Sequence, residues 1–381
     1  MKILHITPAF YPATYWGGPI YSVYGLCNAL AKIPDVTLRV LTTDTAGPSR
    51  SDSTKMTDFP MRYPGGYEVF FCRRWLAASV SPGMLLRLWP MIRWADVVHL
   101  TAVYSPPTIP TLLICRLLGK PMVWSPRGAL QRWERATKLL FKWMWEGICN
   151  ELISRKNCVL HVTSDQEATD SRARMSNATI KLVPNGVDAP EALPVRSWLP
   201  EGRLRLLYLG RLHPIKGIEN LLRALKRLED GSVSLTICGS GDEAYSLSLR
   251  HLVYDLGLEQ CVSFNGHLEN EEKTKAFMQA DVCVMPSFTE NFGMVVAEAL
   301  AHGVPVIASK GTPWADIEKH GCGLWVDNAP ESLAEAIAHM SKADLHEMGI
   351  KGQGWMESSF AWERIALQMG GIYRQLAGHM P

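Results

Sequence analysis

The chain has 381 residues, of which 47% are hydrophobic and 20% charged, so it suits two globular domains and is neither disordered nor fibrous. Its formal net charge of +2 conceals an asymmetry: residues 1–190 carry 22 Lys and Arg against 13 Asp and Glu, and the rest carries 17 against 24. Most of the basic excess lies in residues 73–156, where 13 bases accompany four acids and seven of the thirteen tryptophans. Such an uneven charge distribution is informative about binding partners rather than about the fold.

Nine scattered cysteines, none spaced Cys-X-X-Cys, are expected as buried side chains in a reducing compartment. Every 18-residue apolar stretch is interrupted by a charge, Pro or Gly, and the first residues turn polar too early for a secretory signal. We therefore expect a cytoplasmic protein without a membrane span.

Short β-branched runs alternate with helical patterns along the whole chain. The first half predicts strands at 2–7, 36–42, 67–71, 96–100, 121–125, 158–163 and 180–184. The second half predicts strands at 204–209, 233–238, 261–264, 282–286, 304–308 and 323–326. Continuously apolar strands are typical of parallel sheets covered on both faces. The pattern predicts an α/β fold with two doubly wound sheets, joined through the Pro-rich segment 184–200.

The first predicted strand leads into a loop with two adjacent glycines, Gly17 and Gly18. Glycines let the backbone approach a ligand closely, and the following helix leaves N–H groups free for an anion. The dinucleotide fingerprint Gly-X-Gly-X-X-Gly is absent, so the loop is either a ligand contact or a flexible turn without one.

The second domain opens with a charged loop, Gly210-Arg211-Leu212-His213-Pro214-Ile215-Lys216-Gly217. Directly after a strand, Arg211 and Lys216 can converge on one anionic group, and a guanidinium with an ammonium suits a diphosphate. The alternative is a solvated basic loop.

The tract 286–300 is the most informative part of the chain. A buried strand ends at Pro286, and an apolar helix begins near Gly293, whose first amides favour phosphate. Glu290 lies in the loop and Glu298 in the helix; phosphate would repel both carboxylates, so they are predicted to accept hydrogen bonds from hydroxyls. Apolar neighbours on both sides make Glu298 a poor surface residue.

Together with Asn185-Gly186-Val187-Asp188, these motifs resemble those of the family 4 retaining glycosyltransferases (glycosyltransferase group 1). The likeness extends from the first strand to Phe360-Ala361-Trp362-Glu363, which resembles the start of the family's terminal helix. It implies the GT-B fold, with two Rossmann-like domains facing a central cleft. Residues 1–190 would bind the acceptor, 191–360 the nucleotide sugar, and 361–381 would form a helix that returns to the first domain.

The resemblance also implies roles for individual residues. Arg211 and Lys216 would neutralise the donor diphosphate, Glu298 would hold the ribose hydroxyls, and Glu290 would contact the donor sugar. Glu290, Arg211 and Lys216 are therefore the catalytic candidates. The other donor-binding candidates are Gly17, Gly18, Asn291, Phe292, Gly293 and Met294.

One departure concerns the acceptor or the outer hydroxyls of the sugar. Many members of the family carry a His after the fifth strand, where this chain has Arg127 in Ser125-Pro126-Arg127-Gly128. His99, at the end of an apolar strand, is a second candidate for lining this region. A lone His in that position is also common as a structural residue.

No Asp-X-Asp pair is present to hold a cation over the diphosphate, so we expect neither a metal nor another cofactor. Arg211, Lys216 and the helix amides could stabilise the leaving diphosphate electrostatically. The resemblance implies front-face attack, in which the leaving phosphate helps to deprotonate the acceptor.

The basic aromatic window 73–156 includes a predicted helix over 132–155. Its stripe Trp133, Ala136, Leu140, Met144 and Ile148 is expected to face the core. Arg135, Lys138 and Lys142 lie on the opposite face, flanked by Leu139, Trp143 and Trp145. Bases framed by tryptophan suit an anionic membrane surface; the alternative is helix packing with snorkelled bases.

We expect a metal-independent, retaining hexosyltransferase that takes a UDP- or GDP-linked sugar. Its acceptor would be a lipid-linked or saccharide molecule in cell-surface polysaccharide synthesis, such as lipopolysaccharide or exopolysaccharide, at the inner face of the cytoplasmic membrane. A nucleotide-sugar epimerase and a non-catalytic nucleotide-sugar-binding subunit are the alternatives. Nucleic acid is a poorer explanation of the basic window, because no recognised binding motif accompanies it.

Overall fold

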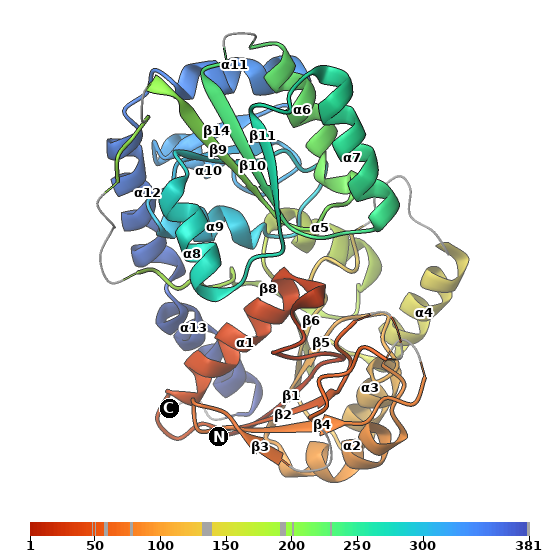
Figure 1. The fold of residues 1–381 in the computed structure, drawn as a ribbon. Coiled ribbons are helices and arrows are strands. Elements are labelled where there is room, and N and C mark those ends of the chain that lie inside the picture. The colour runs from red at the N-terminus through yellow and green to blue at the C-terminus, as the bar shows by residue number, and fades with distance from the viewer. Residues whose placement is uncertain are drawn as a thin grey trace. The chain divides into compact units, whose positions relative to one another are not determined.

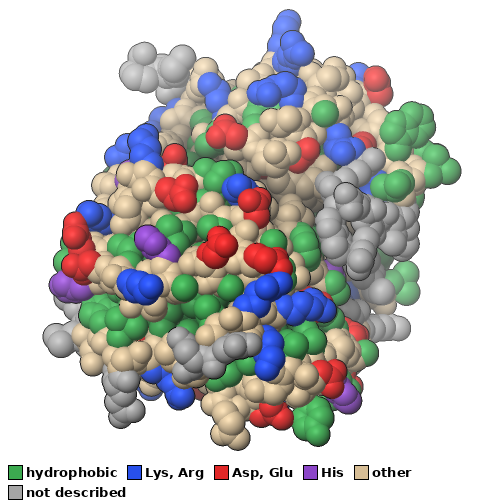
Figure 2. Space-filling view, turned by 90° about the horizontal axis from the view of Figure 1, so that it is seen from above, with side chains coloured by type: hydrophobic (Ala, Val, Ile, Leu, Met, Phe, Trp, Pro, Cys, Tyr) green, Lys and Arg blue, Asp and Glu red, His purple; other side chains and the backbone are tan. Residues whose placement is uncertain are grey.

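The computed structural model describes the chain apart from residues 48, 50, 57–59, 77–78, 132–138, 191–195, 200–201, 229–230 and 379–381. The chain forms two α/β units, coloured mainly red to yellow and green to blue in Figure 1. The first contains Met1–Gly186 together with Trp362–Pro381, and the second contains Val187–Ala361. Figure 2 shows a face on which basic and acidic side chains are interspersed, so the charge asymmetry of the sequence does not produce a field of one sign there.

The first unit is built on a sheet with the strand order β3-β4-β2-β1-β5-β6-β7-β8, parallel except where β3 pairs with β4. Its strands are β1 Lys2–Ile6, β2 Thr37–Thr43, β3 Pro60–Arg62, β4 Glu68–Cys72, β5 Val97–Thr101, β6 Met122–Ser125, β7 Cys158–Val162 and β8 Thr179–Leu182. Its helices are α1 Gly18–Ala31, α2 Pro82–Trp94, α3 Thr108–Leu117, α4 Leu139–Leu152, α5 Asp165–Arg174 and α13 Trp362–Leu376, with a short 3₁₀ turn at Thr14–Trp16.

Helix α13 packs closely against α1 at a point where α1 carries a glycine, Gly25. A Cβ atom on Gly25 of α1 would lie 2.3 Å from the Trp362 indole, and a Cβ on Gly186 would lie equally close to it. Trp362, Ile365, Met369 and Tyr373 are buried with residues of α1 and the sheet. The expected return of the terminal helix to the first unit is therefore confirmed.

The second unit has a parallel sheet with the order β11-β10-β9-β12-β13-β14. Its strands are β9 Leu204–Leu209, β10 Val233–Cys238, β11 Val262–Gly266, β12 Val282–Met285, β13 Val306–Ser309 and β14 Gly323–Val326. Its helices are α6 Ile218–Lys226, α7 Glu243–Leu256, α8 Asn270–Gln279, α9 Met294–Ala301, α10 Asp316–Lys319, α11 Pro330–Met340 and α12 Leu345–Phe360, with a 3₁₀ turn at Pro214–Lys216.

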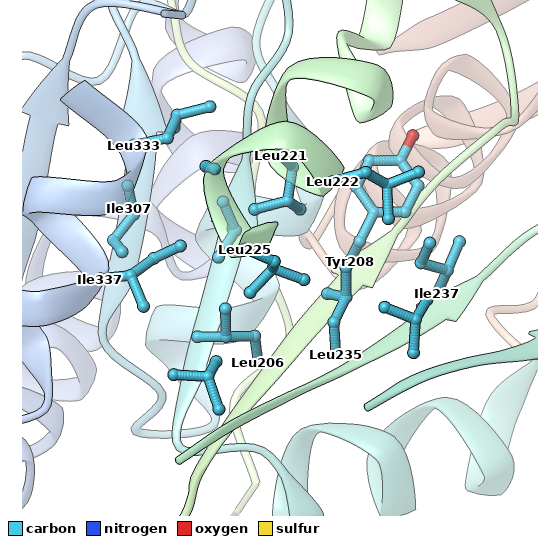
Figure 3. Packing of buried hydrophobic residues seen from close by; sticks show 14 of the residues in the cluster. Leu206, Tyr208, Leu221, Leu222, Leu225, Leu235, Ile237, Ile307, Leu333 and Ile337 are labelled. Carbon is cyan, nitrogen blue, oxygen red and sulfur yellow. The ribbon is translucent and has the colours of Figure 1, made fainter. Parts of the chain in front are cut away.

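One face of the second sheet is covered by the apolar stripe of α6 (Figure 3). Leu221, Leu222 and Leu225 of this helix point toward Leu206 and Tyr208 of the central strand β9. This packing follows from the sequence, because the apolar residues of α6 recur at helical spacing and the alternate strand residues Leu204, Leu206 and Tyr208 share one face of β9. It anchors the loop between β9 and α6, which carries candidate residues.

The prediction of two doubly wound sheets is confirmed, and every predicted strand is present with its ends within two residues of the predicted bounds. The short edge strand β3 was not predicted. The cysteines are free, and all but the half-buried Cys261 are buried, as expected.

The predicted core stripe of α4 is wrong. The helix is observed at Leu139–Leu152, while Trp133, Ala136, Arg135 and Lys138 lie outside the described residues. Leu140, Met144 and Ile148 are exposed, and the buried positions are Glu146 and Cys149. The register differs because the helix docks through Trp145, whose indole N–H donates to the Val103 carbonyl (2.9 Å), and through the buried Glu146 carboxylate. Within the described residues, none of the helices has the length and hydropathy to cross a bilayer.

Candidate active site

The second sheet reverses its winding between β9 and β12. Strands β10 and β11 follow on one side of β9, whereas β12, β13 and β14 follow on the other. Ligands of doubly wound sheets bind at the carboxyl ends of the strands beside such a switch point. Lys216 follows β9 and Glu290 follows β12, so the two most informative motifs of the sequence meet at this switch point.

The loops at this edge are tied to one another by backbone contacts. The Phe288 N–H donates to the Ile215 carbonyl at 2.8 Å, and the Glu290 N–H donates to the Gly311 carbonyl at 2.9 Å. A Cβ atom at Gly217, where φ is 63°, would lie 2.2 Å from the Pro286 carbonyl oxygen, so only glycine allows this approach. The candidate side chains therefore stand on a preorganised frame.

Lys216, in the loop after β9, forms an ion pair with Glu290, in the loop after β12. The Ser287 hydroxyl, itself buried, also donates to Glu290 Oε1 at 2.9 Å. Both charged side chains are mostly buried, with exposed fractions of 15% and 13%. Glu290 is thus the partner of Lys216 in this structure.

Arg211 is exposed at the start of the same loop. Burial, and then the charges of Arg211 and Lys216, lower the pKa of His213 from its ordinary value. The His213 Nδ1 atom accepts a hydrogen bond from the Ile215 N–H at 3.2 Å, as a neutral imidazole can. The loop therefore presents two cations and a neutral His, which favours an anion.

Helix α9 begins directly after Glu290, with Gly293 in the left-handed conformation (φ 77°) and no side chain capping the first turn. The first N–H groups of a helix have no partner within it and attract anions. The turn is held from behind, because the Trp314 indole N–H donates to the Phe292 carbonyl at 2.5 Å and the two rings pack edge to face. Asn291, Phe292, Gly293 and Met294 all lie in this turn or in the first helical residue.

Glu298 is the fifth of the eight residues of α9 and pairs with Lys273 of α8 at 2.6 Å. Both side chains are mostly buried. The second carboxylate oxygen, Oε2, is buried and has no hydrogen-bond partner within the described part of the chain. Lys273 was not among the residues singled out in the sequence, because it lies in a run of charged residues, 271–273, that is typical of a solvated helix.

In the first unit, the switch point lies between β1 and β5, where the loop after β1 ends at Gly17 and Gly18 begins α1. Gly17 has φ 68° and caps α1 without a side chain, and a Cβ there would meet open space. Helix α1 therefore also presents an uncapped N-terminus at the carboxyl edge of its sheet.

His99 is fully buried in β5, and both of its ring nitrogens are occupied. Nδ1 lies 2.7 Å from the Tyr373 hydroxyl of α13, and Nε2 lies 2.7 Å from the Ser125 hydroxyl of β6. The ring stacks on His5 of β1 with centroids 4.3 Å apart. These contacts place His99 inside the hydrogen-bonded core of the first unit.

Arg127 follows β6 in a left-handed backbone conformation with φ 54°. Its guanidinium donates through Nη1 to the Asn185 side-chain oxygen. Its Nε atom is buried without a partner within the described residues. The side chain as a whole is partly accessible at the carboxyl edge of the sheet.

Comparison with known families covers most of the chain in two parts. Residues 16–190 match the family described as Glycosyltransferase Family 4, and residues 191–353 match Glycosyl transferases group 1. The chain belongs to the family 4 glycosyltransferases. The similar D-inositol 3-phosphate glycosyltransferase of Corynebacterium jeikeium is 30% identical over 259 residues, which are 61% of each chain. The chain spans only about half to three fifths of the length of such curated relatives.

Solved structures of similar proteins share the fold over nearly the full length. The sucrose-phosphate synthase of Thermosynechococcus elongatus superposes with a TM-score of 0.76 at 23% identity and covers 100% of both chains. Anabaena HepE, solved in complex with UDP-glucose, gives a TM-score of 0.73 at 17% identity and covers 98% of this chain and 100% of its own. At these identities the likeness concerns the fold, and the expected GT-B architecture is confirmed.

Proposed function

We propose that the protein is a retaining, metal-independent hexosyltransferase that uses a nucleotide-diphosphate sugar as its donor. The observation that carries the proposal is the position of Lys216 and the uncapped α9 at the switch point of the second sheet, with Arg211 on the same loop as Lys216. Two cations and a helix N-terminus suit a diphosphate. UDP and GDP are the candidate nucleotides.

In this proposal the diphosphate displaces Glu290 from Lys216. The ammonium then stabilises the negative charge that develops on the leaving group as the glycosidic bond breaks. The released Glu290 carboxylate can accept a hydrogen bond from a sugar hydroxyl, and the unpaired Oε2 of Glu298 can do so for the ribose. The loop after β1, with Gly17 and Gly18, would supply backbone contacts to the donor.

Binding of UDP and GDP, followed by hydrolysis of UDP-glucose and GDP-mannose, tests the donor site. A Lys216→Ala variant should lose roughly 10²- to 10³-fold in kcat, the magnitude expected when one donor to a developing anion is removed. The matched control is Lys351→Ala, which breaks the exposed pair of Lys351 with Glu347 on α12. Near-normal turnover by Lys216→Ala would refute the assignment.

The alternatives predict different products. An epimerase would convert the donor sugar without an acceptor, and a non-catalytic subunit would bind UDP or GDP but neither hydrolyse nor transfer any sugar. Product analysis with and without a saccharide acceptor separates these outcomes. The presence of Arg211, Lys216, Glu290 and Glu298 together argues against a non-catalytic subunit.

For the acceptor, we propose a lipid-linked or saccharide molecule used in cell-surface polysaccharide synthesis, reached at an anionic membrane surface. Helix α3 packs between α2 and α4, and together the outer sides of these three helices form what we call the α2–α4 face. The face exposes large apolar side chains with the basic residues Arg87, Arg93 and Arg116. The apolar residues are Leu85, Leu86, Trp89, Leu113, Leu117, Leu140, Phe141, Trp143, Met144 and Ile148.

An isolated apolar patch of this kind is unusual on a monomer, and bases beside it complement anionic headgroups. The protein should sediment with vesicles containing phosphatidylglycerol but much less with pure phosphatidylcholine, and added salt should weaken binding. A Leu140→Ser/Trp143→Ser double variant should lose this binding. The control, Tyr254→Ser, removes an equally exposed aromatic from α7 of the second unit. Equal binding by the double variant would contradict the proposal.

A further inference from the structure

A chain of buried hydrogen bonds crosses the first sheet from α13 to β8. The Tyr373 hydroxyl contacts His99 Nδ1, and His99 Nε2 contacts the Ser125 hydroxyl, both at 2.7 Å. The same hydroxyl lies 2.7 Å from His161 Nδ1, and His161 Nε2 lies 2.9 Å from the Val183 carbonyl. These groups tie together α13, β5, β6, β7 and the residue after β8.

The carbonyl at the end of this chain sets its direction. Val183 can only accept, so His161 donates from Nε2. Burial lowers the pKa of both imidazoles, that of His161 to about 3, so both are neutral. His161 Nδ1 then accepts from Ser125, Ser125 accepts from His99 Nε2–H, and His99 Nδ1 accepts from Tyr373.

The hydrogen-bond chain fixes the backbone on both sides of a second contact, between Arg127 and Asn185. Ser125 stands two residues before Arg127, and Val183 stands two residues before Asn185, to which Arg127 donates a hydrogen bond. The left-handed turn at Arg127 is held by Glu167, which accepts from the Gly128 N–H at 2.6 Å. The guanidinium is thus held in one position by Asn185 and by the hydrogen-bonded turn that carries Arg127.

Within the described residues, the charge of Arg127 has few partners. Glu167 is the carboxylate among them that bears on this charge, and it accepts hydrogen bonds from Gly128 and Thr163. The neighbouring imidazoles are neutral, and the Asn185 oxygen is an uncharged acceptor. Burial lowers the pKa of Arg127, so the charged form is incompletely compensated.

We propose that Arg127 binds an anionic oxygen, of a carboxylate or a phosphate, carried by a substrate of this enzyme. A fork of N–H groups at the carboxyl edge of a parallel sheet suits such a planar or tetrahedral anion. The inference rests on the proposed glycosyl transfer and names its substrate class: a charged saccharide or a phosphorylated acceptor. Asn185 accepts a hydrogen bond from the guanidinium but, being uncharged, does not neutralise its positive charge.

The first test measures binding without turnover. With UDP at saturation to occupy the donor diphosphate position, the protein is titrated with inorganic phosphate, D-glucuronate and, as the neutral control, D-glucose. Wild type should bind phosphate or glucuronate in preference to glucose. Arg127→Gln should weaken that binding roughly 10- to 100-fold, as expected when a hydrogen bond to a charged group is lost. Arg39→Gln, which removes a cation paired with Glu68 in the same unit, is the control.

An Asn185→Asp variant separates ligand binding from a structural role. It places a carboxylate on the guanidinium, so it should keep or raise the melting temperature while competing with the ligand and weakening anion binding. A residue that only supported the fold would give the stabilisation without the loss. Arg127→Lys should restore part of the binding that Arg127→Gln removes.

Two further arms identify the source of the anion. UDP-glucuronate is compared with UDP-glucose as donor, and a glycoside is compared with its 6-phosphate as acceptor; Arg127→Gln should abolish whichever preference wild type shows. Equal anion binding by wild type and Arg127→Gln, or full anion binding by Asn185→Asp, would overturn the inference. A protein that does not bind UDP would instead refute the proposed function, since Lys216 and Glu298 lie in the other unit.

Discussion

Two carboxylates of the second unit are each paired with a lysine, but they differ in what they leave unpaired. The Lys216 ammonium and the Ser287 hydroxyl both donate to Oε1 of Glu290. The Lys273 ammonium donates to Oε1 of Glu298, whose Oε2 is buried without a partner in the described structure. A buried acceptor without a donor costs free energy, so the arrangement is explained if a ligand hydroxyl completes it.

Replacement of Glu298 by Ala should therefore weaken UDP binding by about tenfold, as expected for one charged hydrogen bond. Isothermal titration of UDP and of free phosphate measures the effect. Phosphate binding should be unaffected, since Glu298 is assigned to the ribose. Unchanged UDP affinity would contradict this role.

The partner of Glu298 gives a separate prediction. A Lys273→Met variant keeps the apolar stem but removes the charge, and it leaves a mostly buried carboxylate without its cation. The free energy of unfolding should fall by about 1–3 kcal/mol, measured by urea denaturation. Lys310→Met breaks a more exposed pair with Asp327 and should change the stability by less than about 1 kcal/mol. Equal effects of the two variants would argue against the importance of burial.

At the scale of single elements, the contact between α1 and α13 depends on the absence of a side chain. A Gly25→Ala change puts a methyl group 2.3 Å from the Trp362 ring, so helix or ring must move. Overpacking of this kind should lower the free energy of unfolding by about 1–3 kcal/mol. Gly371→Ala in α13, where a Cβ meets nothing within 4 Å, should instead raise it by about 0.5–1 kcal/mol. A neutral or stabilising Gly25→Ala would contradict the assigned packing.

The strands were predictable because short, continuously apolar and β-branched runs such as Val282–Met285 are typical of parallel strands covered on both faces. Strand β3 was not, because all its residues are exposed and only its pairing with β4 defines it. On α4, apolar residues occur on several sides of the helix, so periodicity could not decide which side docks. The buried contacts of Glu146 and Trp145 decided it, and neither is visible in a hydrophobic pattern.

The part of the candidate site that lies on one tract or at the ends of neighbouring strands was predictable from the sequence. Glu290 and Glu298 lie on one continuous strand-loop-helix tract, and Lys216 follows the neighbouring central strand, so their proximity follows from the topology of the sheet. Lys273 comes from α8, and its approach to Glu298 depends on how that helix packs against the sheet. The hydrogen-bond chain of the first unit likewise joins His99 to Tyr373, which is 274 residues later in the sequence.

At the scale of the whole molecule, three buried histidines make stability depend on pH. Burial lowers the pKa of His5 and of His161 to about 3 and that of His99 well below its ordinary value of 6.5. Above pH 6.5 these side chains are neutral in both the folded and the unfolded chain, and they contribute no pH dependence. Below it the unfolded chain binds protons that the folded chain does not, so stability is lost as the pH falls from about 6.5 toward 3.

Each such histidine should contribute a slope of up to about 1.4 kcal/mol per pH unit in this window. Urea denaturation at pH 7.5, 6.5, 5.5 and 5.0 should show a plateau followed by a steep decline. His5→Leu removes one of the three groups, so it should flatten the decline by about one such slope even if it lowers stability at pH 7.5. Comparison of slopes between wild type and variant cancels the carboxylates, which titrate in both. Parallel curves would mean that His5 is protonated as readily in the folded as in the unfolded chain, against its complete burial.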